Sequence, residues 1–251
     1  MQRCLLTHPN MKKPPKKIDA VNPITSQKND TDSFLKTVSK TPLPTPLAEG
    51  ESGHLIFALD ATASRQATWD QASALQADMF TNTQGLAGLK MQLVYFRGYD
   101  ECRASPWLGN SKALLNMMAK ISCVAGRTQI ERVLKHAIAE AKRQPVQAVV
   151  FVGDSVEESV DELGNLAGQL KILGLPVFIF QEGFDVHASM AFKQIASVSG
   201  GAHCRFDSNS AAQLGQLLNA VAVYAAGGKA ALLRLSNSGS SQAAQLLEQL
   251  S

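Results

Sequence analysis

A short apolar run that ends in an aspartate carries the first candidate chemistry in this chain. The run Leu55–Leu59 is followed by Asp60, and the hydroxyl residues Thr62 and Ser64 come next at every second position. Such a run is typical of a buried strand, and Asp60 must lie at its end because an unpaired carboxylate is costly in an apolar core. One carboxylate and two hydroxyls in one turn are hard oxygen ligands that suit Mg²⁺. Taken alone, the same hydroxyls can instead cap a helix.

Two later segments add further oxygen ligands. Asp154 comes one glycine after the apolar run Ala148–Val152, and Thr128 ends a Gly-Arg-Thr turn before a strongly helical stretch. Open α/β sheets bind ligands at the carboxyl ends of their strands, so we expect the oxygens of Asp60, Asp154 and Thr128 to converge at one rim. Each residue also has a structural alternative. Asp154 can cap its own turn, and Thr128 with Glu131 matches a Thr-x-x-Glu capping box.

Charged residues beside these candidates have ordinary interpretations. Glu157 and Glu158 follow Asp154 in the sequence. We expect them to be solvated charges at a helix entry, which add negative potential to the rim. Arg65 follows Ser64 directly, and a surface position is expected for it, from which it can pair with an incoming carboxylate.

The order of the candidate ligands resembles the metal-ion-dependent adhesion site (MIDAS) of von Willebrand factor A (VWA) domains. That family carries Asp-x-Ser-x-Ser on its first strand, a threonine in a later loop and an aspartate after the fourth strand. The resemblance covers about residues 53–226, with threonine in place of the first serine, a change that keeps the hydroxyl and adds a methyl group. The matching residues are Asp60, Thr62, Ser64, Thr128 and Asp154.

This resemblance implies a divalent-metal-dependent interaction domain rather than an enzyme. Thr62, Ser64 and Thr128 would ligate Mg²⁺ or Mn²⁺ directly, and Asp60 and Asp154 would act mostly through bound waters. Such an ion stays under-neutralised, so its open position attracts an aspartate or glutamate of a partner protein. Similar intracellular domains in bacteria serve as adaptors beside chaperones or AAA+ ATPases, which indicates a bacterial origin and a class of partner.

An enzymatic alternative rests on the same residues. Asp60-x-Thr62-x-Ser64 also resembles the nucleophile loop of haloacid dehalogenase-like phosphotransferases, with Asp60 as the nucleophile and Asp154 holding Mg²⁺. Thr62 cannot serve as the general acid of that class, and no apolar strand precedes Thr128. The chain has no P-loop, G-x-G-x-x-G or G-x-S-x-G motif, which disfavours common nucleotide-binding and serine-hydrolase classes. A metal-free scaffold remains a third hypothesis.

Strand-like runs and helical patterns alternate along the chain, which predicts a doubly wound, mostly parallel, Rossmann-like α/β sheet. A short antiparallel edge strand is expected within Cys102–Leu108. The other expected strands are 55–59, 90–97, 147–152, 177–180 and 202–206. The expected helices are 65–81, 112–121, 129–143, 159–173, 188–198 and 211–226.

The charge distribution divides the chain into three parts. Residues 1–50 carry eight Lys or Arg against four acids and few large apolar groups, so we expect a disordered basic tail with one helical patch at 32–38. Residues 51–226 form the expected domain, and 227–251 a flexible Gly/Ser-rich extension. Residues 51–251 hold 16 basic and 17 acidic groups, which argues against a nucleic-acid surface. Translation can start at Met1 or Met11.

Cysteine usage and hydropathy indicate the compartment. Four cysteines without a C-x-x-C pair favour free thiols in a reducing environment. The set Cys102, Cys123, His203 and Cys204 fits no known zinc spacing. The opening residues lack a signal-peptide core, and no apolar run has the length of a membrane span. The sequence therefore predicts a cytoplasmic protein without a membrane partner.

Overall fold

The computed structural model of the protein describes residues 33–34, 36–37, 53–66, 89–206, 221–222 and 225. The strands are β1 (Gly53–Asp60), β2 (Leu89–Arg97), β3 (Glu101–Ala104), β4 (Ala148–Gly153), β5 (Val177–Glu182) and β6 (His203–Phe206). The helices are the 3-10 turn η1 (Ala63–Arg65), α3 (Ser111–Met118), α4 (Ile130–Ala141), α5 (Val160–Ile172) and α6 (Val186–Ser199).

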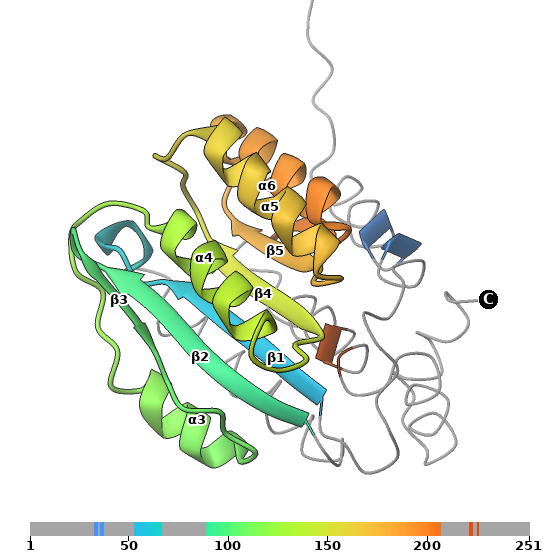
Figure 1. Ribbon diagram of the computed structural model, residues 1–251. Helices are drawn as coiled ribbons and strands as arrows, with labels where there is room; N and C mark the ends of the chain where they lie inside the picture. Colours follow the sequence, from blue (N-terminus) through green and yellow to red (C-terminus); the bar gives the residue numbers. More distant parts are fainter. Residues whose placement is uncertain are drawn as a thin grey trace, which may run out of the picture.

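The strands form one sheet in the order β3-β2-β1-β4-β5-β6. Every neighbouring pair is parallel except β2 with β3, which is antiparallel. This arrangement confirms the predicted doubly wound sheet with one antiparallel edge strand. The parallel order also brings the carboxyl ends of β1, β2 and β4 to the same end of the sheet, where Figure 1 shows η1 and the start of α4.

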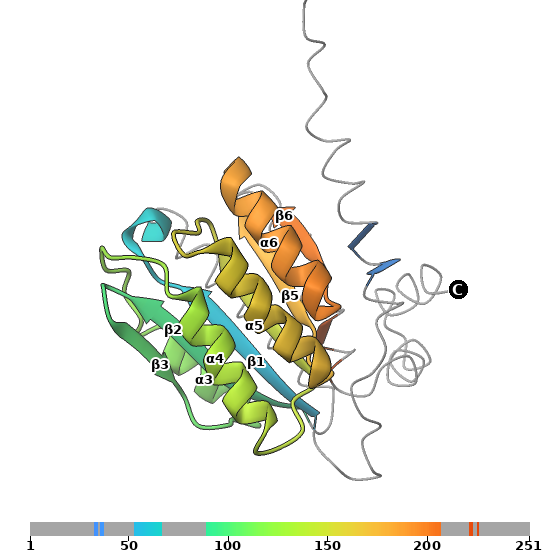
Figure 2. The same ribbon diagram turned by 45° about the horizontal axis from the view of Figure 1, so that its top comes forward.

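Both faces of the sheet are covered, which explains why its central strands are apolar at almost every position. Helices α4, α5 and α6 lie side by side across one face in both views (Figures 1 and 2). Ile56 and Ala58 belong to the cluster on that face, whereas Phe57 and Leu59 belong to the cluster shared with α3. The period-two alternation along β1 therefore divides its side chains between two cores.

Most predicted elements are present with shifted ends. Helix α4 buries Ile130, Val133, Leu134, Ala137 and Ile138, the face that the helical spacing predicts. The Ser159 side chain caps α5 by accepting a hydrogen bond from the Glu162 N–H, 3.5 Å away. Helix α6 ends at Ser199, and the cap residue Gly200 has a φ of 83°, the left-handed conformation that favours glycine.

The edge strand is shorter than predicted. Strand β3 ends at Ala104. Beyond it, the Ser105 N–H still donates to the Leu93 carbonyl at 2.8 Å, and an isolated bridge joins Met91 and Leu108. Ser105 interrupts the ladder because its side-chain oxygen accepts the hydrogen bond of the Leu93 N–H at 2.9 Å. Pro106 then has no N–H to donate, so regular pairing stops there.

One residue of the N-terminal segment belongs to the core. Phe34 is 2% exposed, and its ring centroid lies 5.2 Å from that of Phe180 and 6.1 Å from that of Phe178. Val221, Ala222 and Ala225 are buried in the same cluster. Apart from residues 33–34 and 36–37, the expected basic tail lies outside the described residues. So do nearly all of the helices expected at 65–81 and 211–226, and the whole extension 227–251.

The described residues also bear on two further expectations. No helix among them is long and apolar enough to cross a membrane. Cys102 is a free thiol. Cys102 lies on β3 and Cys204 on β6, at opposite edges of the sheet, so the four-residue zinc set cannot assemble. The described ranges contain no group of three or more His, Cys, Asp or Glu placed to hold a metal ion.

Candidate metal site at the carboxyl ends of the strands

Asp60 is the last residue of β1 and is fully buried. Its Oδ1 accepts a hydrogen bond from the Thr62 N–H at 2.7 Å. Its Oδ2 is also buried and has no hydrogen-bond partner among the described residues. A buried carboxylate oxygen without a donor is costly, and it is the kind of atom that a cation or a cation-bound water satisfies.

Asp154 brings a second such atom to the same place. Leu59 of β1 pairs with Val152 of β4, which sets Gly153 beside Asp60 and Asp154 immediately beyond it. A Cβ at Gly153 would lie 3.4 Å from the Asp60 Cβ and 2.8 Å from the Phe151 ring, so the two strand ends are in close contact. The Asp154 Oδ1 is buried and, in the described part of the chain, accepts no hydrogen bond.

The electrostatics of Asp60 follow from this crowding. The pKa of Asp60 is raised to about 6, mainly because the carboxyl is buried and in smaller part because of the neighbouring Asp154 charge. Hydrogen bonds from Thr62 and the positive charge of Arg65 act in the opposite direction. The ionised site therefore lacks positive charge, which a divalent cation would supply.

Thr62 and Ser64 place two hydroxyls beside this carboxylate. Their side-chain oxygens are 3.1 Å apart. Thr62 precedes η1 but makes no side-chain capping hydrogen bond to it, so the capping interpretation does not account for its hydroxyl. Thr62 is buried while Ser64 is exposed, so the two hydroxyls lie at different depths below the protein surface.

Arg65 corrects an expectation from the sequence. Its side chain is completely buried instead of lying at the surface, and its Nε donates to Glu182 Oε2 at 2.9 Å. Its Nη1 donates to the Asp60 carbonyl oxygen at 3.0 Å. Arg65 therefore ties η1 both to the end of β1 and to the last residue of β5. The spacing gave no signal of this role, because the partner is 117 residues away.

The loop that carries Thr128 is attached to the ends of β1 and β2. The Val124 N–H donates to the Ala61 carbonyl at 3.0 Å, and the Arg127 N–H to the Gly98 carbonyl at 3.1 Å. A Cβ at Gly126 would lie only 1.9 Å from the Gly98 oxygen, so this close approach requires glycine.

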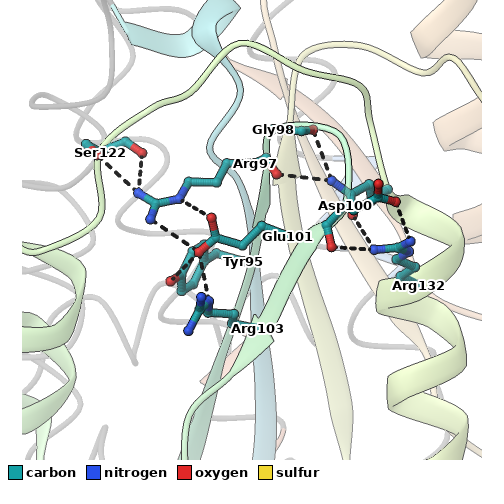
Figure 3. Close-up of polar contacts among 9 residues, drawn as sticks. Tyr95, Arg97, Gly98, Asp100, Glu101, Arg103, Ser122 and Arg132 are labelled. Atoms are coloured by element: carbon teal, nitrogen blue, oxygen red, sulfur yellow. Dashed lines mark hydrogen bonds and ion pairs between the residues drawn. The ribbon is translucent and has the colours of Figure 1, made fainter.

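Salt bridges fix the surrounding rim (Figure 3). Arg97 pairs with Glu101 at 2.9 Å and also donates to the Ser122 carbonyl oxygen at 3.0 Å. Arg132 pairs with Asp100 at 2.8 Å. These contacts hold the β2–β3 turn against the 122–132 segment.

Thr128 does not form the alternative capping box with Glu131. The residue preceding α4 is Gln129, and no side chain caps that helix as its N-cap residue. Instead, the Thr128 hydroxyl donates to Glu158 Oε2 and accepts from the Glu157 N–H at 2.9 Å. Glu157 and Glu158 are therefore more than solvated helix-entry charges. No described hydrogen bond joins Thr128 to the other candidate ligands, although its loop runs beside Thr62.

The donor set fits a hard divalent cation. The carboxylates of Asp60 and Asp154 each retain a buried oxygen without a described donor. The hydroxyls of Thr62 and Ser64 are in contact with each other beside Asp60. Mg²⁺ and Mn²⁺ prefer such oxygen ligands and keep several waters, so a complete protein cage is unnecessary.

The sequence matches no protein-family model and none of the curated proteins. Solved structures do resemble the fold. Proximal thread matrix protein 1 from the mussel byssus, with a zinc-occupied MIDAS motif, is 17% identical, with a TM-score of 0.57 over 68% of this chain and 46% of that one. A von Willebrand factor type A protein from Catenulispora acidiphila is 15% identical, with a TM-score of 0.56 over 68% and 43%.

A third similar structure is the SpRpn10 VWA domain, which is 13% identical with a TM-score of 0.53 over 67% of this chain and 92% of that domain. The chain therefore has a VWA-like fold. It spans less than half the length of the mussel and Catenulispora proteins.

Proposed function

We propose that this chain is a divalent-metal-dependent protein-interaction domain with a site of the MIDAS type. Asp60, Thr62, Ser64, Thr128 and Asp154 would hold Mg²⁺ or Mn²⁺. The observation that carries the proposal is the pair of buried carboxylate oxygens, Asp60 Oδ2 and Asp154 Oδ1, without described donors at the ends of adjacent strands. The VWA-like fold and the zinc-occupied MIDAS of the mussel protein support it.

Each residue has a distinct task in this proposal. When bound, the ion supplies a concentrated positive charge with a coordination position open to a carboxylate. Thr62, Ser64 and Thr128 would contact it through neutral hydroxyls, which would leave most of its charge unneutralised. Asp60 and Asp154 would hold it mostly through water. The remaining positive charge would attract an aspartate or glutamate of a partner protein.

The positive side chain of Arg127, close to the proposed site, also favours an acidic partner. Arg127, directly before Thr128, is exposed, and its guanidinium lies 5.8 Å from the centre of the Tyr99 ring. Tyr99 is 66% exposed, and no salt bridge of the described residues involves Arg127. This charge can attract a carboxylate toward the metal side of the loop.

The cellular setting completes the proposal. The near-neutral charge of residues 51–251 argues against nucleic acid, and the cysteine usage argues for a reducing compartment such as the cytoplasm. The resemblance to intracellular VWA domains of bacteria implies a bacterial origin. A chaperone or AAA+ ATPase is the proposed class of partner. Catalysis is not part of the proposal, because Asp60 is fully buried and Thr62 cannot protonate a leaving group.

Thermal melts and a pull-down test the proposed function. Excess Mg²⁺ or Mn²⁺ is expected to stabilise the wild type by RT ln(1 + [L]/Kd), about 2.7 kcal/mol at a hundredfold excess over Kd. The Asp60→Ala variant should show no such shift. A partner captured by the wild type should be lost with EDTA and with Asp60→Ala. Capture that is unaffected by both, or Mg²⁺-dependent hydrolysis of an aryl phosphate, contradicts the proposal.

A further inference from the structure

Glu158 joins the candidate ligand Thr128 to the start of α4. Its Oε2 accepts the hydrogen bond of the Thr128 hydroxyl, and its Oε1 accepts that of the Glu131 N–H at 3.2 Å. Thr128 is 7% exposed, and Glu158 is half-buried. One carboxylate thus holds a proposed metal ligand and the first turn of a helix together.

These contacts determine how the Thr128 hydroxyl is oriented. A hydroxyl has one proton to donate and two lone pairs. Its proton is given to Glu158, and one lone pair accepts from the Glu157 N–H at 2.9 Å. A single lone pair then remains for another contact. An ionised acceptor also makes the hydroxyl oxygen more electron-rich, which strengthens its binding to a cation.

We propose that Glu158 is a positioning residue of the metal site, acting through Thr128, an inference that rests on the proposed function. Glu158 itself does not bind the ion. It fixes the direction of the remaining lone pair of Thr128. Partners of this kind, one step removed from the ion, typically change metal affinity by 10- to 100-fold when they are replaced.

A purely structural role makes a different prediction. The Glu158 carboxylate also accepts from the N-terminal turn of α4, where the helix dipole favours negative charge. If that were its whole function, replacing Glu158 would lower thermal stability and leave metal affinity unchanged. Affinity and stability therefore have to be measured separately on the same variants.

The test is a calorimetric titration of the full chain with Mn²⁺, with melting temperatures measured alongside. Glu158→Gln should weaken Mn²⁺ binding at least tenfold. Glu157→Gln is the matched control, because it removes one negative charge from the same loop, while among the described residues the Glu157 side chain accepts only from the Thr128 backbone N–H and not from its hydroxyl. Its effect should be much smaller.

A double-mutant cycle separates this mechanism from a general charge effect. Thr128→Val should itself weaken Mn²⁺ binding, and in that background Glu158→Gln should add almost nothing, since the two residues act as one unit. Additive effects, equal losses in Glu157→Gln and Glu158→Gln, or an unchanged affinity in Glu158→Gln would overturn the assignment. If Glu158→Gln does not fold, Glu158→Asp keeps the charge and should still lose affinity. A wild type that binds no Mn²⁺ would overturn the proposed function as well.

Discussion

At the scale of single residues, the buried charge of Asp60, which the proposed metal site requires, lowers the stability of the fold. Its folded-state pKa is about 6, compared with 3.8 for an ordinary aspartate. Between these values the folded chain binds the proton more tightly than the unfolded chain, so stability falls as the pH rises from 3.8 to 6 and stays level above. At 1.36 kcal/mol per pKa unit the total cost is about 3 kcal/mol.

Asp60→Asn should therefore stabilise the metal-free protein. The amide oxygen can still accept the Thr62 N–H, while the buried charge beside Asp154 is gone. In the presence of EDTA, the variant should be more stable than the wild type by up to about 3 kcal/mol above the pKa of Asp60, and the difference should close as the pH falls below 4. Urea unfolding across that pH range measures it. A variant that is less stable at every pH would contradict this account of the site.

The Arg65–Glu182 pair is the second residue-scale feature. Breaking a buried pair leaves one charge uncompensated, so Glu182→Ala should cost about 3–5 kcal/mol. Replacing both residues with apolar ones, Arg65→Met with Glu182→Leu, should recover much of that loss. The exposed Arg132–Asp100 pair is the control, and Arg132→Ala should cost about 1 kcal/mol or less. Equal losses at the buried and exposed pairs would show that burial does not strengthen the Arg65 contact.

At the scale of elements, the loop 122–128 depends on a glycine contact. In Gly126→Ala the new Cβ would meet the Gly98 backbone, so the loop must move, at a cost of about 1–3 kcal/mol. Because Thr128 follows two residues later, Mn²⁺ affinity should fall as well. Gly109→Ala is the matched control, since its Cβ would have nothing within 4 Å. Calorimetric titration of both variants measures Mn²⁺ affinity, and urea unfolding measures stability. An unchanged affinity in Gly126→Ala would show that the Gly126–Gly98 contact does not position the metal site.

The sequence predicted those elements whose signal is local, and it missed contacts between residues that are far apart in the chain. Helix α4 and strand β1 carry their own periodicity, so local patterns sufficed. That Asp60 and Asp154 lie close together was predicted because the carboxyl ends of parallel strands meet at the same edge of the sheet. The contacts of Arg65 with Glu182 and of Thr128 with Glu158 depend on how distant elements pack, and no residue spacing encodes them.

At the scale of the whole molecule, Phe34 extends the core beyond residues 51–226. Composition predicted a disordered tail because the segment 1–50 has few apolar groups, yet Phe34 is buried against Phe178 and Phe180. Only tertiary packing distinguishes a docked phenylalanine from a solvated one. Deleting residues 1–45 therefore removes a core side chain along with the basic residues.

Phe34→Ala should destabilise the domain by about 3–5 kcal/mol, the usual cost of such a truncation in a core. Ser33→Ala is the control, because Ser33 is exposed and the substitution keeps its carbonyl oxygen, which accepts from the Thr37 hydroxyl. Urea unfolding of both variants measures the difference. A loss below about 0.5 kcal/mol in Phe34→Ala would be that of a surface substitution and would place the side chain outside the core.

The central claim is that the carboxyl-end rim binds a divalent metal through Asp60. Calorimetric titration of EDTA-treated protein with Mn²⁺ tests it most directly, at a pH above 7 where Asp60 is ionised. We expect one saturable site in the wild type, loss of that site in Asp60→Ala, and retention of it in the exposed control Glu162→Gln. No saturable binding by the wild type, or equal binding by Asp60→Ala, would contradict the account.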